Sequence, residues 1–267
     1  MTLRLAWLTD IHVNFLTPEK REAFCDELCD SEADAFLITG DISEAPTLEL
    51  HLMELADGVR RPLYFVLGNH DFYGGSIPDV RSAIAARCAR SEWLRYLPEA
   101  GVVSLSETCA LVGHDGWADG RFGNYRDSPV MLNDYVLIRE LAWLQPEDRL
   151  SRIQALAEEG ASHLRRALKE ALDRHPRAVV ATHVPPFREA CWHQGAISDD
   201  DYLPHFSSKA SGDALREVLE SRPDKEVLVL CGHTHGAGRT LPLPNLEVRT
   251  GGAEYGRPAI QEILSIE

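Results

Sequence analysis

Side chains that could hold a metal ion follow five short apolar runs of the sequence. In chain order they are Asp10 and His12, Asp41, Asn69 and His70, His183, and His233 and His235. Imidazole and carboxylate donors together suit Mn, Fe, Zn or Co better than Ca or Mg, which prefer shells made of oxygen. The residue types therefore predict a centre for one of these first-row metals.

Two of the motifs have a geometry that presents side chains. In Gly68-Asn69-His70-Asp71, the glycine after an apolar run permits a sharp turn that directs the next side chains outward. In Gly232-His233-Thr234-His235, the two imidazoles are two positions apart and so lie on one side of an extended segment. Each motif alone is common, whereas all five in this order are difficult to obtain by accident.

The apolar runs themselves predict the strands that position these residues. They are rich in β-branched or aromatic residues, stop at turn formers, and cover residues 3–8, 35–39, 63–67, 178–182 and 227–231. Apolar residues at three- and four-residue spacing predict helices over residues 18–29, 46–59, 78–97, 151–174 and 209–221. Shorter strands of a more antiparallel kind are expected over residues 102–105, 110–112, 241–250 and 259–266. Strands that alternate with helices indicate an α/β fold, in which ligands bind where the carboxyl ends of the strands meet.

The ordered motifs resemble those of the calcineurin-like metallophosphoesterase family, whose pattern is Asp-x-His, Gly-Asp, Gly-Asn-His-Asp/Glu, a lone His and Gly-His-x-His. The match extends from Asp10 to His235. This resemblance implies a two-layer β-sheet core flanked by helices, an αββα sandwich, with a pair of divalent metal ions. Many members have Gly-Asp-x-x-Asp, but this chain has Gly40-Asp41-Ile42-Ser43-Glu44, which keeps the bridging position and changes its surroundings.

The same resemblance implies a role for each residue of the centre. Asp10, His12 and His235 would bind one metal ion, Asn69, His183 and His233 would bind the other, and Asp41 would bridge the two. His70 would stay unligated near the phosphate, where it could donate a proton to the leaving oxygen, and Asp71 would orient or bias it.

The predicted activity is hydrolysis of a small phosphomonoester or phosphodiester by a metal-bound hydroxide. Two divalent ions roughly 3.5–4 Å apart can clamp the attacking and departing oxygens and lower the pKa of a bridging water to near neutrality. With two carboxylates and one hydroxide, such a core carries about one positive charge and attracts phosphate. A nuclease with the same site is one alternative, and a metal-stabilised scaffold without turnover is another.

Composition and length narrow these alternatives. The 267 residues predict a single domain, residues 1–267, and 44% hydrophobic with 26% charged residues is typical of a soluble globular protein. The net charge of −15 and the lack of a basic run count against a nucleic-acid partner. The longest apolar runs are far shorter than the roughly 20 residues needed to span a bilayer. Six cysteines without a Cys-x-x-Cys pair, and no signal-peptide pattern, predict reduced thiols in the cytoplasm.

Two irregular segments, residues 113–145 and 185–208, are expected to wall the pocket. Both are rich in residue types typical of loops, and loops of this length are usually functional or disordered. His114 follows a strand-like run and is a further candidate for the pocket. The roles of His193 and His205 stay open at this stage, as do the substrate and the oligomeric state.

Overall fold

Five strands form the first sheet of the computed structural model, which describes residues 2–267. Their spatial order is β13-β1-β2-β3-β4. The bounds are β13 (Glu262–Ile266), β1 (Leu3–Leu8), β2 (Ala35–Thr39), β3 (Leu63–Val66) and β4 (Leu94–Tyr96). Strands β1 to β4 are parallel, and β13 pairs with β1 in the antiparallel sense. The parallel strands place the ends of β1, β2 and β3 at the same edge.

Six strands form the second sheet, in the order β11-β12-β10-β7-β6-β5. The bounds are β11 (Gly238–Leu243), β12 (Leu246–Thr250), β10 (Glu226–Cys231), β7 (Arg177–Ala181), β6 (Cys109–Gly113) and β5 (Val103–Ser104). The four central strands are parallel, and β11 and β5 pair in the antiparallel sense at the two margins. A separate hairpin joins β8 (Trp192–His193) and β9 (Ala196–Ile197).

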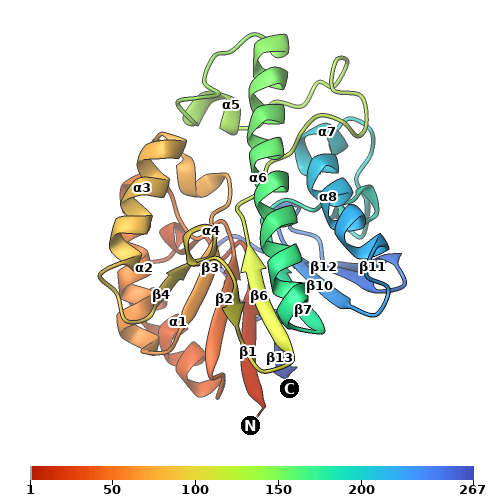
Figure 1. The fold of residues 1–267 in the computed structure, drawn as a ribbon. Coiled ribbons are helices and arrows are strands. Elements are labelled where there is room, and N and C mark those ends of the chain that lie inside the picture. The colour runs from red at the N-terminus through yellow and green to blue at the C-terminus, as the bar shows by residue number, and fades with distance from the viewer. Residues whose placement is uncertain (1) are drawn as a thin grey trace.

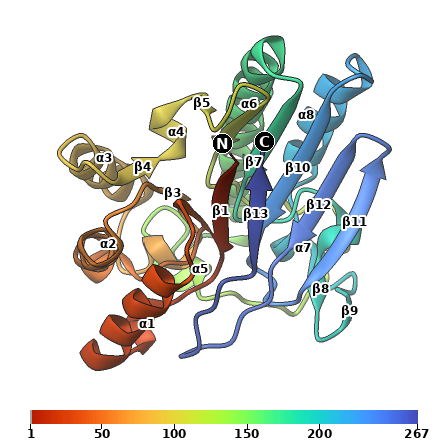
Figure 2. The same ribbon diagram turned by 90° about the horizontal axis from the view of Figure 1, so that it is seen from below.

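The two sheets pack face to face, because alternate residues of their strands are apolar and buried. Trp7 and Leu37 from the first sheet meet Leu111, Val179 and Leu230 from the second in one cluster. Helices cover the outer faces (Figures 1 and 2). They are α1 (Pro18–Asp30), α2 (Ala45–Val59) and α3 (Ile77–Cys88) on the first sheet, and α6 (Pro146–Arg174) and α8 (Lys209–Glu220) on the second. The predicted αββα architecture is confirmed.

The remaining elements are single turns in the connections. They are α4 (Leu97–Ala100), α5 (Asp134–Leu137), α7 (Leu203–Phe206) and the 3₁₀ turns η1 (Val13–Phe15), η2 (His70–Phe72) and η3 (Arg188–Ala190). Among residues 2–267, no helix combines the length and the apolar composition that a membrane crossing requires. In Figure 1 the chain termini lie at one end of the sandwich, and α5 and its connections lie at the other.

The structure differs from the sequence prediction most clearly over residues 78–97. The predicted helix ends at Cys88, and Leu94–Tyr96 forms the edge strand β4 instead. The hydroxyl of Ser91 accepts hydrogen bonds from the N–H groups of Trp93 and Leu94, which stabilises a turn between helix and strand. Leu94 and Tyr96 are buried while Arg95 is exposed, the alternation of a strand that a helical pattern had masked.

Candidate metal centre

Five loops at one edge of the two sheets carry the residues predicted to bind metal. Asp10 and His12 follow β1, Asp41 follows β2, and Asn69 follows β3. His183 follows β7, and His233 and His235 follow β10. The structure brings all seven side chains into two adjoining groups, one around Asp10 and one around Asn69, with Asp41 between them.

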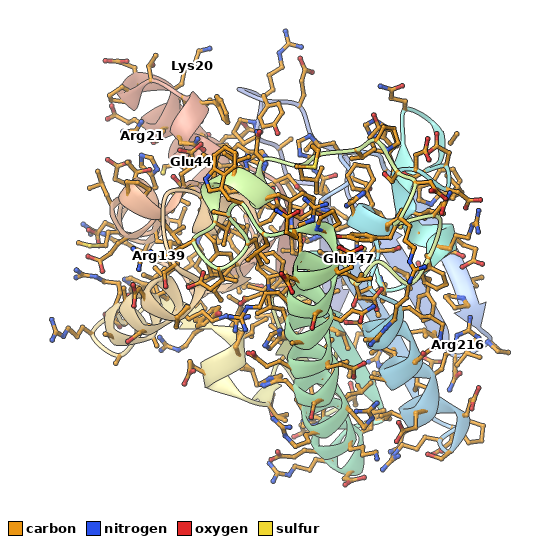
Figure 3. All side chains as sticks on the ribbon, turned by 90° about the horizontal axis from the view of Figure 1, so that it is seen from above. Lys20, Arg21, Glu44, Arg139, Glu147 and Arg216 are labelled. Atoms are coloured by element: carbon orange, nitrogen blue, oxygen red, sulfur yellow. The ribbon has the colours of Figure 1, made fainter. Side chains whose placement is uncertain are left out.

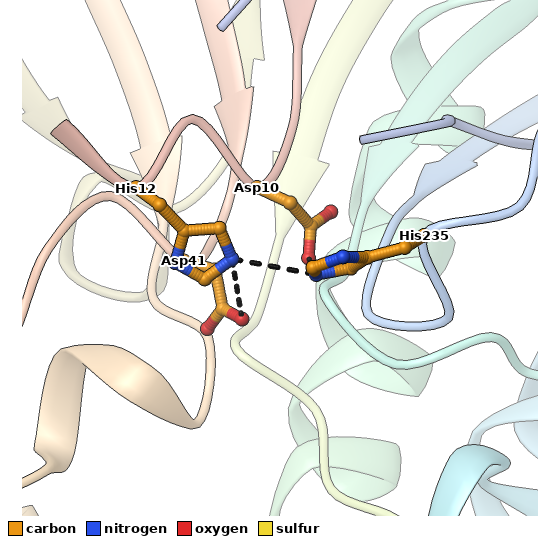
Figure 4. A group of neighbouring side chains, drawn as sticks. All are labelled: Asp10, His12, Asp41 and His235. Atoms are coloured by element: carbon orange, nitrogen blue, oxygen red, sulfur yellow. Dashed lines mark hydrogen bonds and ion pairs between the residues drawn. The ribbon is translucent and has the colours of Figure 1, made fainter. Parts of the chain in front are cut away.

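The first group consists of Asp10, His12, Asp41 and His235. Each offers one ligand atom, and these atoms lie within 4.8 Å of one another (Figure 4). The Nε2 atoms of His12 and His235 are 3.4 Å apart, and Nε2 of His235 lies 3.4 Å from Oδ1 of Asp10. Carboxylate and imidazole donors at these separations can surround one ion.

The second group converges on the side-chain oxygen of Asn69. Its Oδ1 lies 3.0 Å from Nε2 of His183 and 2.9 Å from Nδ1 of His233. The amide Nδ2 of Asn69 donates to Oδ1 of Asp134 at 2.8 Å, which directs Oδ1 toward the histidines. The hydroxyl of Tyr73 donates to the same carboxylate oxygen at 2.7 Å. Asp134 therefore orients Asn69.

Asp41 lies between the two groups. Its Oδ2 is 3.6 Å from Nε2 of His12, and its Oδ1 is 3.4 Å from Nε2 of His183. The backbone N–H of His70 donates to Oδ1 at 2.9 Å and holds the carboxylate in this orientation. One oxygen facing each group is the arrangement that a bridging carboxylate requires.

Hydrogen bonds to backbone carbonyls fix the rings of the second group. Nδ1–H of His183 donates to the carbonyl of Thr39 at 2.8 Å, and Nε2–H of His233 donates to that of His205 at 3.0 Å. Metal-binding histidines commonly donate their second ring N–H in this way. In the neutral rings, the lone pairs that remain both face the oxygen of Asn69, which is also an acceptor. Once both rings are neutral, as metal binding requires, three acceptors are directed at one point, which fits a metal cation.

Backbone strain is concentrated at the same residues. Five of the nine non-glycine residues with positive φ in the described chain are predicted ligands: Asp10, His12, Asp41, His233 and His235. Such conformations cost about 1–3 kcal/mol each and cluster at functional sites. Hydrogen bonds between the loops compensate, because the N–H groups of Asp10 and His12 donate to the carbonyls of Gly40 and Asp41 at 3.0 Å.

Two glycines of the motifs are needed for close approach. A Cβ atom at Gly68 would lie 2.1 Å from Oδ1 of Asp41, and one at Gly232 would lie 2.0 Å from Oδ2 of Asp10. No real Cβ contact is this short, so a side chain at either position would displace a carboxylate of the centre.

Burial and charge at the centre favour a bound cation. Burial opposes the ionisation of Asp41, but the neighbouring His183 and His70 outweigh it and hold its pKa well below the ordinary value. Burial also opposes the protonation of His183, yet the carboxylates of Asp41 and Asp10 raise its pKa to about 10. Burial lowers the pKa of His12 to about 4, so its ring is neutral and able to bind a metal. Without a metal ion the carboxylates therefore hold a proton on His183, and a bound metal cation would displace that proton.

His70 and Asp71 have different surroundings although they are adjacent in sequence. The His70 side chain is 16% exposed, stacks on Tyr73 at 4.2 Å between ring centroids, and has Nε2 3.9 Å from Oδ2 of Asp41. The carboxylate of Asp71 is buried and accepts backbone N–H bonds of 2.8–2.9 Å from Gly68, Ile42 and Ser43. Within residues 2–267, no hydrogen bond joins Asp71 to the His70 ring. Asp71 thus connects two ligand loops to each other.

A cleft of about 370 Å³ opens over the centre. Its floor contains Asp41, Asn69, His70, His233 and His235. We call the surrounding side chains the rim, which consists of Tyr73, Met131, Leu132, Asn133, His193, Phe206 and Tyr255, and Thr234 also lines the cleft. Residues 113–145 and 185–208 both contribute side chains to the rim. The connection that follows β12 contributes Tyr255.

Sequence reasoning missed Asp134 and Tyr255. Asp134 lies in the irregular residues 113–145, and no fixed spacing relates it to Asn69. Tyr255 lies between Gly252 and Gly256 in a connection with no apolar periodicity. The only feature of the sequence that points to either residue is that it lies in a long loop.

His114, His193 and His205, whose roles the sequence left open, have different positions relative to the cleft. His114 is buried against α6, where Gly160 leaves room for its ring, and it does not line the cleft. His193 lines the cleft, and its Nδ1–H donates to the carbonyl of Thr234 at 2.9 Å. His205 bonds through its ring to Tyr135 at 2.6 Å and, through its carbonyl, supports His233.

Comparisons with known proteins identify similar sequences and folds. The sequence model of calcineurin-like phosphoesterases matches residues 3–237. The phosphopantetheinyl hydrolase of Mycobacterium tuberculosis is 18% identical with a TM-score of 0.67, and the match covers 94% of this chain and 90% of that one. A dimetal phosphatase from Danio rerio is 15% identical with a TM-score of 0.58, covering 94% and 87%. The protein TT1561 of Thermus thermophilus is 15% identical with a TM-score of 0.55, covering 94% and 90%. No curated protein matches the sequence significantly.

Proposed function

Because the chain belongs to the calcineurin-like phosphoesterase family, we propose that it hydrolyses a small phosphomonoester or phosphodiester with two divalent metal ions. Family membership supports a phosphoesterase hydrolase, and the Asp and His cluster supports metal binding. The donor set of carboxylates, imidazoles and one amide favours Mn, Fe, Zn or Co. The finer choice between monoester and diester depends on the rim.

The observation that carries this proposal is the position of Asp41 between two groups of donors. Three acceptors meet around Asn69 on one side, and the atoms of Asp10, His12 and His235 gather on the other. The oxygens of Asp41 face both groups at 3.4 and 3.6 Å. Asp10, His12 and His235 would hold one ion, and Asn69, His183 and His233 would hold the second.

Two bound ions would supply Lewis-acid polarisation of the phosphoryl oxygens and a nucleophile derived from water. The protein groups have separate tasks. Asp41 lies between the two donor groups and would bind an ion on each side, and Asp134 accepts a hydrogen bond from the amide of Asn69. The carbonyls of Thr39 and His205 keep the rings of His183 and His233 oriented.

His70 is suited to act on the leaving group. Its ring is held by stacking on Tyr73, and its Nε2 lies next to Asp41 while its side chain remains open to the cleft. A proton on Nε2 would be donated to the departing ester oxygen, or would stabilise the charge that develops there. Asp71 contributes by holding the loops of Asp41 and His70 together rather than by contact with the ring.

Hydrolysis of p-nitrophenyl phosphate and of bis-p-nitrophenyl phosphate tests the proposal. The protein is reconstituted in turn with Mn, Fe, Zn, Co and Mg, and its metal content is measured alongside turnover. We expect turnover with at least one first-row metal at a stoichiometry of about two ions, since the site offers two donor groups. Binding of two ions without hydrolysis of any phosphoester in a broader panel would instead favour a non-catalytic scaffold.

A further inference from the structure

Tyr255 forms an apolar platform beside the first donor group. Its ring centroid lies 4.6 Å from that of His12, 5.0 Å from that of His235 and 4.9 Å from that of Phe15. The residue is nevertheless 49% exposed and lines the cleft. One part of the ring therefore packs on the site histidines while another part faces the space above them.

The loop that carries Tyr255 is attached to the floor. The N–H of Ala253 donates to the carbonyl of His235 at 3.3 Å, and that of Gly252 donates to Oε1 of Gln261 at 3.0 Å. Gly256, with φ of 77°, permits the turn that follows. The loop is therefore bonded, two positions before Tyr255, to a predicted ligand residue.

The opposite end of the cleft is apolar as well. The ring of Phe206 meets that of His233 edge-on at 5.3 Å, and Tyr202 packs on Phe206 at 5.4 Å. Met131 lines the cleft and is 62% exposed. At the Tyr255 end, Phe15 is 54% exposed and packs on Tyr255. Phe206 is itself largely buried, whereas Met131 and Tyr255 are exposed beside the polar floor, and large apolar side chains around a polar floor are typical of a ligand-binding groove.

The charge of the lining is the second observation. The thirteen lining residues include neither Lys nor Arg. None of the four cations labelled in Figure 3, which are Lys20, Arg21, Arg139 and Arg216, is among the lining residues. A second phosphate or a carboxylate on the substrate would thus meet no Lys or Arg of the lining, in a protein with a net charge of −15.

From these observations we propose a substrate class for the site. The substrate is a phosphoester whose reacting phosphoryl group is its one anionic group, and whose alcohol portion is aromatic or extended and apolar and packs on Tyr255. This inference rests on the proposed function and deepens it. Tyr255 is the specificity-determining residue, since it contacts the alcohol portion and no reacting atom.

Binding of phosphonates tests the inference without turnover, because their C–P bond is not hydrolysed. Dissociation constants of benzylphosphonate and methylphosphonate are measured by calorimetry on the metal-loaded protein. We expect benzylphosphonate to bind about tenfold or more tightly than methylphosphonate. Tyr255→Ala should reduce that preference by about tenfold, whereas Tyr255→Phe, which keeps the ring, should retain it. Leu50→Ala, at an exposed apolar residue on α2, is the matched control and should change neither constant.

A second pair of ligands tests the charge argument. Propylphosphonate and 3-phosphonopropionate have similar length, but the latter ends in a carboxylate. We expect 3-phosphonopropionate to bind the more weakly of the two, and tighter binding would overturn the inference. A benzyl preference that Tyr255→Ala leaves unchanged would also overturn it, while hydrolysis in the p-nitrophenyl assays would leave the proposed function standing. Failure of every phosphonate to bind the metal-loaded protein would overturn the substrate class alone, and the absence of hydrolysis in the p-nitrophenyl assays as well would overturn the proposed function.

Discussion

The floor and the rim of the cleft are built in opposite ways. Floor residues such as Asp41 and His233 follow strand ends, and hydrogen bonds with backbone groups hold their side chains in place. Rim residues such as Met131 and Tyr255 come from long connections and expose much of their surface. We infer from this difference that the floor would determine the reaction and the rim would determine the substrate. Changes in the floor should therefore affect every substrate, and changes in the rim only some.

The largest effect is expected for Asp41→Asn. The substitution removes a buried negative charge that faces both donor groups, so both predicted metal positions lose the anionic ligand that they share. We expect turnover of both p-nitrophenyl substrates to fall by about 10³-fold or more, with metal content well below that of the unchanged protein. Metal analysis and steady-state kinetics measure the two effects, and Asp26→Asn, at an exposed position on α1, is the control. Full metal content together with full turnover would contradict the role given to Asp41.

His70→Ala should have a large effect of a different kind. In the proposed assignment the His70 ring is not a ligand of either metal ion, so the metal content of the variant should be unchanged. Turnover should fall by about 10²–10⁴-fold, the range typical of a lost general acid. The fall should be smaller for p-nitrophenyl esters than for alkyl esters, since p-nitrophenolate leaves without much help from a proton. Equal turnover before and after the substitution would remove His70 from the mechanism.

Asp71→Ala should act on stability. Its carboxylate accepts three backbone N–H bonds from two ligand loops at a fully buried position. The alanine leaves those three donors without a partner, at about 1–3 kcal/mol each. We expect the free energy of unfolding to fall by about 3 kcal/mol or more, read from urea denaturation of the metal-loaded protein. Asp57→Ala, at an exposed position on α2, should change it by well under half that amount. A loss of turnover with unchanged stability would show that Asp71 acts on chemistry instead.

Much of the floor could be predicted from the sequence because local rules determine it. Each predicted ligand stands within a few residues of the end of an apolar run, and the ends of parallel strands meet at one edge. The same rules predicted five strands and most of the helices. They failed at residues 94–96, where contact with β3 makes an edge strand out of a segment whose local pattern favours a helix.

The sequence predicted that residues 113–145 and 185–208 wall the pocket, but the individual rim residues could not be predicted, because contacts between distant parts of the chain determine them. Tyr255 packs on Phe15, and Asp134 bonds to Asn69, and no short-range pattern encodes either pair. His114 shows the converse. It follows a strand as the predicted ligands do, yet its ring turns toward α6 because Gly160 leaves space there. The end of a strand thus predicts the backbone position of a residue, whereas the orientation of its side chain depends on the element packed against that residue.

The smallest effect is expected at the rim, for His193→Ala. The hairpin of β8 and β9 is packed on the loop after His235, where a Cβ at Gly236 would lie 2.2 Å from the carbonyl oxygen of Trp192. Nδ1–H of His193 is used by the carbonyl of Thr234, which leaves Nε2 for a ligand in the cleft.

A hydrogen bond from this position would contribute equally to bound substrate and transition state, because the ring is fixed and belongs to the rim rather than the floor. We therefore expect KM to rise by about two- to tenfold with kcat nearly unchanged. His193→Phe keeps the packing on Tyr202 and Phe206 and should show the same rise if the nitrogen is what matters. If kcat instead fell as far as in His70→Ala, the ring would belong to the reacting part of the site, and the division between floor and rim would fail at this residue.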